Sequence, residues 1–186
     1  MKLKQQVNPH FLFNSLNILD CLVCEQRTEQ ASAYIHKLAG IYRYMLQNEE
    51  ETLVRLREEM AFVGMYVDLL QVRFPEGFRV ETDIPDEAMN RHVLPCSVQL
   101  LIENAIKHNS VGADRPLVIR IVAGAGAVTV SNNLQLKVSG TTSTRVGLNY
   151  IRQQYLDLSG IPIGIRRTDT EYCVTCLLYT SPSPRD

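Results

Sequence analysis

The spacing of apolar residues changes once along the chain, near residue 77. Before that point apolar residues recur at steps of three and four, which places them on one face of a helix. Three helices are predicted in this part, over residues 12–23, 35–45 and 56–74. The third alternates steps of four and three, like the heptad seam along which helices pack side by side. The three stripes are Leu12, Leu16, Leu19 and Val23; Ile35, Leu38, Tyr42 and Met45; and Leu56, Met60, Val63, Val67, Leu70 and Phe74.

Polar segments mark the ends of these helices. Asn8 can cap the first helix and Pro9 suits its first turn, unless a helix enters from upstream and Pro9 kinks it. The runs 25–30 and 48–52 are typical of turns, and Pro-Glu-Gly at 75–77 ends the third helix. Stripes this narrow bury too little surface for a core within one chain. We therefore expect two copies of the chain to pair their helices in a four-helix bundle.

After Gly77, apolar positions alternate, as in β-strands with one buried face. Helical faces interrupt the alternation twice, and one stretch rich in Ser, Thr and Gly has no period, which is typical of a loop. This mixed order predicts an α/β sandwich, with a mixed sheet that carries helices on one face. The predicted strands are 78–84, 117–121, 128–130 and a hairpin over 161–175; the helices are 98–105 and 147–158; the loop is 134–145.

The chain is therefore predicted to be an α+β protein with two regions. Residues 1–76 form a helical hairpin dimerisation region, and residues 77–175 form the α/β sandwich. Residues 176–186 carry Ser-Pro-Ser-Pro and resemble the conceptual translation of a sequencing adapter. We interpret them as a non-native tail; the alternative is a genuine disordered Ser/Pro tail.

The composition is that of a globular protein. Hydrophobic residues make up 45% and charged residues 21% of the 186 residues. The formal net charge of -1 gives no overall basic field, so we expect no nucleic-acid partner. No apolar run approaches the roughly 18–20 residues that span a bilayer. The five cysteines include two Cys-x-x-Cys pairs, which we interpret as reduced thiols rather than as a zinc site.

Two asparagine-rich motifs carry the candidate chemistry. The first places a histidine directly after a proline, and the second lies on the helix predicted around 98–105. They read N-P-H-F-L-F-N-S-L-N from Asn8 and E-N-A-I-K-H-N from Glu103. The first is similar to the phosphoacceptor segment of the LytS-like sensor histidine kinases. The second resembles the N-box of their ATP-binding domain, which the gyrase, Hsp90 and MutL ATPases share.

His10 is the phosphoacceptor that this resemblance implies. An imidazole is largely neutral near pH 7, and one of its nitrogens is then a nucleophile. Other kinase classes often carry an acidic residue directly after this histidine, whereas this chain has Phe11, so the group that takes the proton stays open. Asn14 lies one turn on and shares a face with His10. It either orients the imidazole or a water, or is an ordinary solvated residue.

Asn104 is the magnesium ligand that the resemblance implies, because Mg²⁺ takes oxygen ligands and keeps several waters. Lys107 and His108 lie one turn further on and can face the phosphates of ATP. The alternative is an ordinary helix C-terminus, where the helix dipole favours cations.

Two further boxes are eroded relative to the family. Asn132 and Asn133 stand where related kinases have Asp-x-Gly-x-Gly, and Asn132 takes the place of the aspartate that reads the adenine amino group. The alternative is a strand-end turn, which Asn also favours. The segment 143–148 resembles the family's G-x-G-x-G-L box but keeps only Gly147, followed by Leu148. Arg145 in this segment can contribute charge to the phosphates instead.

The resemblance implies a two-component sensor kinase that uses ATP and Mg²⁺. It would phosphorylate His10 within a homodimer and pass the group to an aspartate of a response regulator, often one with a LytTR-type DNA-binding domain. The chain would be the cytoplasmic portion of an inner-membrane sensor, attached to the membrane only through an upstream segment. One alternative is a dimerisation or signalling scaffold with a degenerate nucleotide site. A gyrase- or Hsp90-like ATPase is less favoured, because Leu100 stands where those enzymes have their general-base glutamate.

Overall fold

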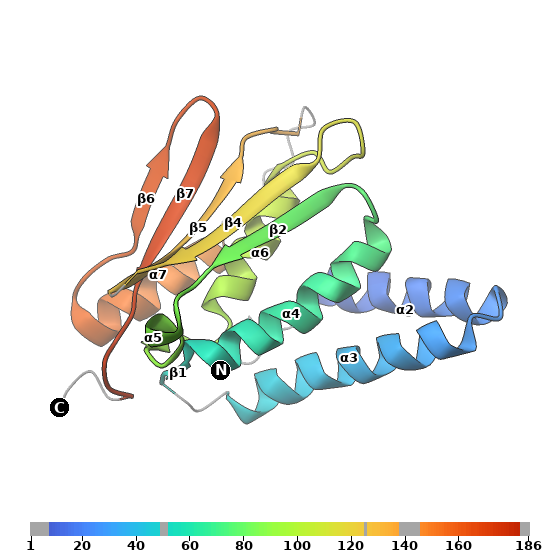
Figure 1. Cartoon of the computed structure of the whole chain (residues 1–186), viewed down its shortest axis with the longest axis horizontal. Coiled ribbons are helices and arrows are strands. Elements are labelled where there is room, and N and C mark those ends of the chain that lie inside the picture. The colour runs from blue at the N-terminus through green and yellow to red at the C-terminus, as the bar shows by residue number, and fades with distance from the viewer. Residues whose placement is uncertain (1–7, 49–51, 125, 138–145, 183–186) are drawn as a thin grey trace.

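The computed structural model describes residues 8–48, 52–124, 126–137 and 146–182. A hairpin of two helices, α2 (Pro9–Cys24) and α3 (Thr28–Gln47), projects from a body in which helices cover one face of a sheet (Figure 1). A third helix, α4 (Leu56–Arg73), lies between the hairpin and the body. The predicted α+β class, a helical hairpin followed by an α/β sandwich, is confirmed. In the described part of the chain, no helix combines the length and apolarity needed to cross a membrane.

The hairpin begins and turns where the sequence predicts. The side-chain oxygen of Asn8 accepts a hydrogen bond of 3.0 Å from the backbone N–H of His10, and Pro9 occupies the first turn of α2. Of the stripe predicted for α3, Met45 alone is fully buried. The inward side of α3 packs against α4, and a second apolar face of the hairpin stays exposed. That outer face contains Phe13, Leu16, Val23, Ile35 and Leu46.

The apolar stripe on α4 finds its partners inside the same chain. Leu56, Val63 and Leu70 are buried, because α4 contacts α3 on one side and α6 (Ser97–His108) on the other. The expectation that this stripe needs a second copy of the chain is wrong. Periodicity shows that a face is buried but cannot show which neighbour buries it.

The body is built on a mixed sheet of five strands. They are β2 (Phe78–Asp83), β4 (Leu117–Ala123), β5 (Ala127–Asn133), β6 (Gly164–Arg167) and β7 (Glu171–Leu177). Their order is β2-β4-β5-β7-β6, with β2 parallel to β4 and the other neighbours antiparallel. In β4 the buried Ile119 and Ile121 alternate with the exposed Arg120 and Val122. One face of the sheet therefore meets the helices and the other faces solvent.

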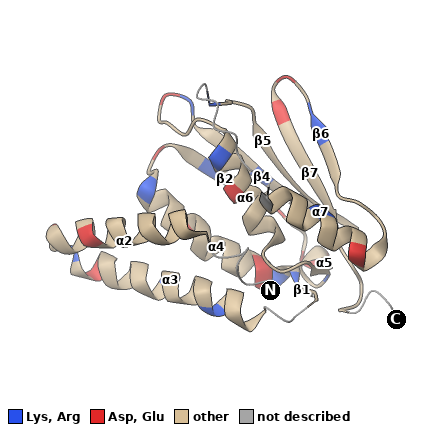
Figure 2. Ribbon diagram, turned by 180° about the vertical axis from the view of Figure 1, so that it is seen from behind, with Lys and Arg blue, Asp and Glu red and all other residues tan. Residues whose placement is uncertain are grey.

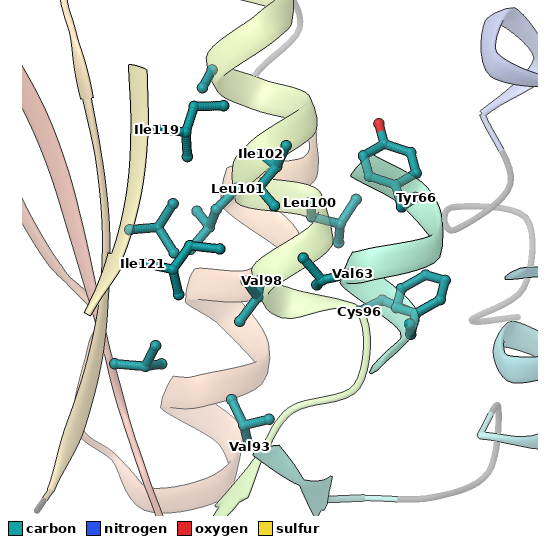
Figure 3. Close-up of a cluster of buried hydrophobic side chains, with 14 of the residues drawn as sticks. Val63, Tyr66, Val93, Cys96, Val98, Leu100, Leu101, Ile102, Ile119 and Ile121 are labelled. Atoms are coloured by element: carbon teal, nitrogen blue, oxygen red, sulfur yellow. The ribbon is translucent and has the colours of Figure 1, made fainter. Parts of the chain in front are cut away.

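Two helices, α6 and α7 (Val146–Ser159), cover the inner face of the sheet, as the view from behind shows (Figure 2). The apolar face predicted for α6 points into the core between the sheet and α4 (Figure 3). Because one face of α6 is fixed in this way, its polar residues are directed toward its flanks. The α6 core residues are Val98, Leu101, Ile102 and Ala105.

Three short elements were not predicted. The two-residue strands β1 (Val54–Arg55) and β3 (His92–Val93) pair antiparallel, and α5 (Asp86–Met89) forms a single turn before β3. Elements this short show no periodicity, so the sequence pattern does not reveal them.

The chain beyond Thr175 packs on the body. Cys176 continues β7 and pairs with Val128, and Tyr179 forms a bridge with His92. The segment that we interpret as a non-native tail is therefore part of the fold as far as Tyr179. The origin of this segment stays a prediction.

Candidate functional site

A buried carboxylate on α4 fixes the start of α6. One oxygen of Glu59 accepts hydrogen bonds from the Tyr44 hydroxyl (2.7 Å) and the Cys96 N–H (2.8 Å), and the other accepts from Val98 N–H (3.0 Å) and Gln99 N–H (3.4 Å). A helix leaves such N–H groups unpaired at its N-terminus, and Cys96 itself supplies no side-chain cap. Glu59 therefore caps α6 from a neighbouring helix, where its charge also suits the helix dipole.

This cap joins three helices. Burial raises the pKa of Glu59 to about 6, and the hydrogen bonds from Tyr44 and the backbone of α6 oppose that rise. Burial and the nearby Glu59 also raise the pKa of Tyr44, so its hydroxyl stays protonated and donates to the carboxylate. The hydrogen-bonded cluster links α3, α4 and the start of the helix that carries the second motif.

A cavity of about 470 Å³ lies along one side of α6. Four predicted nucleotide residues line it: Asn104 and His108 on α6, Asn132 at the end of β5, and Leu148 on α7. The Asn132 side-chain N–H donates to Asn133 O at 2.9 Å, which fixes the orientation of its nearly buried amide. Apolar walls with a few converging polar groups are typical of small-molecule sites.

Lys107 and Asn133 are placed elsewhere. Lys107 lines a groove on the other side of α6. The Asn133 side chain accepts a hydrogen bond of 2.7 Å from Val118 N–H and donates one of 3.3 Å to Pro116 O. Asn133 therefore anchors the start of β4 and is not among the described residues that line the cavity.

Gly147, the glycine that remains in segment 143–148, packs against α6. A Cβ built on Gly147 would lie 3.7 Å from Leu100 Cδ2, which is an ordinary contact distance, so this position tolerates a side chain. Arg145 lies outside the described residues.

Several residues of the cavity wall were missed by the sequence analysis. Arg152 lies one turn after Leu148 on α7, so helical spacing from a predicted residue would have found it. Arg167 and Tyr172 pair across β6 and β7, far in sequence from either motif, and no local signal points to them. Asn109, the last residue of the second motif, also lines the cavity.

Asn109 connects α6 to the segment that follows β5. It is buried, its side-chain N–H donates to Ala105 O at 2.8 Å, and its side-chain oxygen accepts from Gln135 N–H at 2.8 Å. Its amide thereby holds one rim of the cavity in place.

An open groove of about 780 Å³ lies on the other side of α6, and His10 lies in it. Asn14 lines the same groove, as its spacing from His10 predicted, together with Arg73, Glu103 and Lys107. Side chains of α6 thus line both the cavity and the groove. Asn104 lies in the cavity, and His10 lies in the groove.

A direct contact joins the two sequence motifs. The Asn8 side-chain N–H donates a hydrogen bond of 2.7 Å to one oxygen of Glu103, across a separation of 95 residues. The other Glu103 oxygen accepts from the Gln99 side chain at 3.1 Å. The start of α2 is therefore held against α6 of the same chain.

Comparison with known proteins shows what this chain is similar to. The family described as Histidine kinase matches residues 1–78. The sensor protein LytS of Bacillus cereus is 39% identical over 106 residues, which cover 57% of this chain and 18% of that protein. Residues 1–78 thus match the histidine kinase family. The likeness to LytS extends over most of the chain, since the sensor protein LytS of Staphylococcus haemolyticus matches 93% of it at 29% identity.

This LytS-like chain spans only 18% to 32% of the length of these two relatives. Among solved structures, the catalytic domain of histidine kinase ThkA aligns with a TM-score of 0.48 at 17% identity, covering 72% of this chain and 97% of that chain. The histidine kinase AdeS of Acinetobacter baumannii aligns with a TM-score of 0.47 at 13% identity, covering 94% of this chain and 99% of that chain.

Proposed function

We propose that this LytS-like kinase uses ATP and Mg²⁺ to phosphorylate His10 and then passes the phosphoryl group to an aspartate of a response regulator. The observation that carries the proposal is the position of α6 between the cavity and the groove. Adjacent residues of one helix line different hollows, Asn104 the cavity and Glu103 the groove that holds His10. A phosphoryl donor and its acceptor would then lie on either side of the same helix.

The residues of the cavity fit a nucleotide. Asn104 offers a side-chain carbonyl, the type of ligand that Mg²⁺ takes alongside phosphate oxygens and waters. Arg152 and Arg167 can bind phosphate, and the Asn132 carbonyl can accept a hydrogen bond from the adenine amino group. Bound ATP would supply the phosphoryl group. The protein's own task is positioning and charge neutralisation.

The active form is proposed to be a homodimer that pairs the outer face of the α2–α3 hairpin. Phe13, Leu16 and Leu46 on this face are 62%, 49% and 58% exposed. Helix α2 carries a single charged residue, Asp20, near its far end (Figure 2). Pairing two such hairpins would form a four-helix bundle.

The names of the relatives support a proposal for the cellular setting, and the resemblance to the LytS-like kinases supports one for the partner. Those relatives are called sensor proteins, so we propose that the chain works as the cytoplasmic part of a membrane-held sensor. The regulator is proposed to be of the LytTR type. Purified regulators can be compared by mixing each with phosphorylated protein, and the proposed partner should remove the label fastest.

A scaffold with a degenerate nucleotide site is the second candidate. It is favoured by segment 143–148, where Gly147 is the remaining glycine of the family's box. It is also favoured by Asn132, which stands in place of the family's adenine-reading aspartate. Calorimetry with Mg-ATP separates the two proposals, because the kinase binds the nucleotide and the scaffold does not.

Labelled ATP tests the kinase proposal directly. Incubation with Mg²⁺ should give a label that is stable in alkali and lost in acid, as expected for phosphohistidine, and His10→Gln should abolish it. His36→Gln is the matched control, because His36 is exposed on α3 and, among the described residues, binds only its own helix, through Ser32 O at 2.7 Å. A label that survives in His10→Gln would reject His10 as the acceptor.

A further inference from the structure

His10 has no acidic neighbour in sequence that could take up its proton. The next residue, Phe11, is partly buried, and its ring lies 5.2 Å from the ring of Tyr66. Phe11 therefore anchors α2 to α4 and leaves proton transfer to a group from elsewhere in the fold.

One amide connects His10 to a carboxylate on α6. The Asn8 side-chain oxygen accepts from the His10 backbone N–H at 3.0 Å, and the Asn8 side-chain N–H donates to Glu103 at 2.7 Å. Gln99 holds the second Glu103 oxygen at 3.1 Å. Among the described residues that line the His10 groove, Glu103 alone carries a carboxylate.

We propose that Glu103 of the same chain is the group that orients the His10 ring and accepts its proton during phosphoryl transfer. One neutral ring nitrogen attacks the γ-phosphorus. The N–P bond forms, the bond from that phosphorus to the bridging oxygen breaks, and ADP leaves with the electron pair. The other ring nitrogen gives its proton to the Glu103 carboxylate, so the phosphorylated ring is left neutral. This proposal rests on the proposed function of His10.

The charges around the groove support this assignment. Arg73, Lys107 and Lys137 also line it, and cations of this kind suit an incoming phosphoryl group. They cannot accept a proton while charged, so they leave that role to Glu103. The placement of Lys107 in this groove rather than in the cavity is explained in the same way.

The first test compares Glu103→Gln with wild type and with Glu87→Gln, an exposed residue of α5. The rate constant for His10 phosphorylation should fall about 100-fold in Glu103→Gln, the usual lower range for a lost proton-transfer group, with KM for ATP unchanged. Glu87→Gln should match wild type. A wild-type rate in Glu103→Gln would overturn the proposal.

A second test needs neither nucleotide nor metal. Phosphoramidate, a small phosphoryl donor, should label His10 in wild type and more slowly in Glu103→Gln. Glu87→Gln, the exposed control on α5, should retain the wild-type phosphoramidate rate. Equal phosphoramidate rates in wild type and Glu103→Gln would overturn the role of Glu103 but leave His10 as the acceptor. Absence of any ATP-dependent label on wild type would instead reject the proposed function.

Mixed dimers test whether Glu103 acts within its own chain. A dimer of one His10→Gln chain and one Glu103→Gln chain places the intact His10 and the intact Glu103 on different chains. Its rate should be no higher than that of Glu103→Gln alone. Recovery of the rate would overturn the assignment to the same chain.

Asn8→Asp tests the bridge itself. Aspartate keeps an oxygen that can cap α2 but lacks the N–H that donates to Glu103. The rate should fall, and combining Asn8→Asp with Glu103→Gln should add little to the loss, because both changes remove one interaction. Fully additive losses would show that Asn8 and Glu103 act independently.

Discussion

Glu59 caps the start of α6, the helix that carries the second motif. Its two oxygens accept from three backbone N–H groups at the start of α6 and from the Tyr44 hydroxyl on α3. A glutamine there would turn its amide N–H groups toward some of these donors. The buried donors would then lose their acceptor.

We expect Glu59→Gln to lower the free energy of unfolding by about 1–3 kcal/mol, the cost of leaving buried donors unpaired. Urea unfolding measures this change. Glu58→Gln, at the exposed neighbouring position, is the control and should leave stability within about 0.5 kcal/mol of wild type. Equal stability of both variants would show that Glu59 is not the cap.

The same carboxylate makes stability depend on pH. Its pKa in the folded protein, about 6, lies above the ordinary value of 4.5, so the folded state binds more protons than the unfolded state between these values. The contribution of Glu59 to stability is therefore lost as pH rises from about 4.5 to about 6. The destabilisation by Glu59→Gln should be larger near pH 4 than near pH 7, by ~2 kcal/mol. A pH-independent difference would contradict the raised pKa.

The cavity gives a second prediction at this scale. Asn104→Ala should weaken Mg-ATP binding by at least ~10-fold in calorimetry, because it removes the proposed metal ligand, while the melting temperature stays near that of wild type. Asn104 is only partly buried, so its loss leaves no core cavity. Asn90→Ala, at an exposed position after α5, should bind as wild type. Unchanged affinity in Asn104→Ala would remove Asn104 from the site.

At the scale of elements, two helical faces have different roles. The α4 face is filled by α3 and α6 within the chain, whereas the outer face of the hairpin has no partner among the described residues. Leu70 is only 5% exposed, so its burial stabilises the fold of the single chain. Leu46 is 58% exposed, so its side chain is accessible for pairing with a second chain.

Glutamate substitutions should separate these roles. Leu46→Glu should give monomers in ultracentrifugation. Their melting temperature should be close to that of the wild-type monomer, because Leu46 is exposed and lies outside the core. Leu70→Glu should lose about 2–5 kcal/mol of stability, because it places a charge in the core, and each kcal/mol lowers the melting temperature by about 2–4 °C. Dissociation by Leu70→Glu without loss of stability would restore α4 as the dimer seam.

At the scale of the whole molecule, the last part of the chain packs on the body beside β3 and the end of α7. The backbone of Tyr179 exchanges hydrogen bonds of 2.8 Å and 2.9 Å with His92, and its hydroxyl donates to Ser159 at 3.0 Å. The ring stacks on Tyr155, with ring centroids 6.1 Å apart. One residue thus joins β3 to α7.

Removing residues 179–186 should lower stability by about 1–3 kcal/mol, from the lost hydrogen bonds and ring contact. The melting temperature should fall by several degrees for a chain of this size. A chain that ends at Ser181 keeps Tyr179 and should melt as wild type. No change in melting temperature on removing 179–186 would show that Tyr179 adds nothing to the fold.

Local sequence determined most of the elements and the identity of the two motifs. The cap at Asn8, the break between α2 and α3, the apolar face of α6 and the alternation in β4 all depend on residues a few positions apart. Spacing also predicted that His10 and Asn14 share a face, because helical geometry is the same in every fold.

Only the tertiary structure decided which residues meet across long stretches of chain. It placed Lys107 with His10 and not with Asn104, engaged Asn133 with the start of β4, and brought Arg167 and Tyr172 to the cavity. The contact of Asn8 with Glu103 also depends on how α2, α4 and α6 pack. Such contacts arise from the burial of several faces at once, which no local pattern records, because the period of an apolar stripe is the same whichever neighbour covers it.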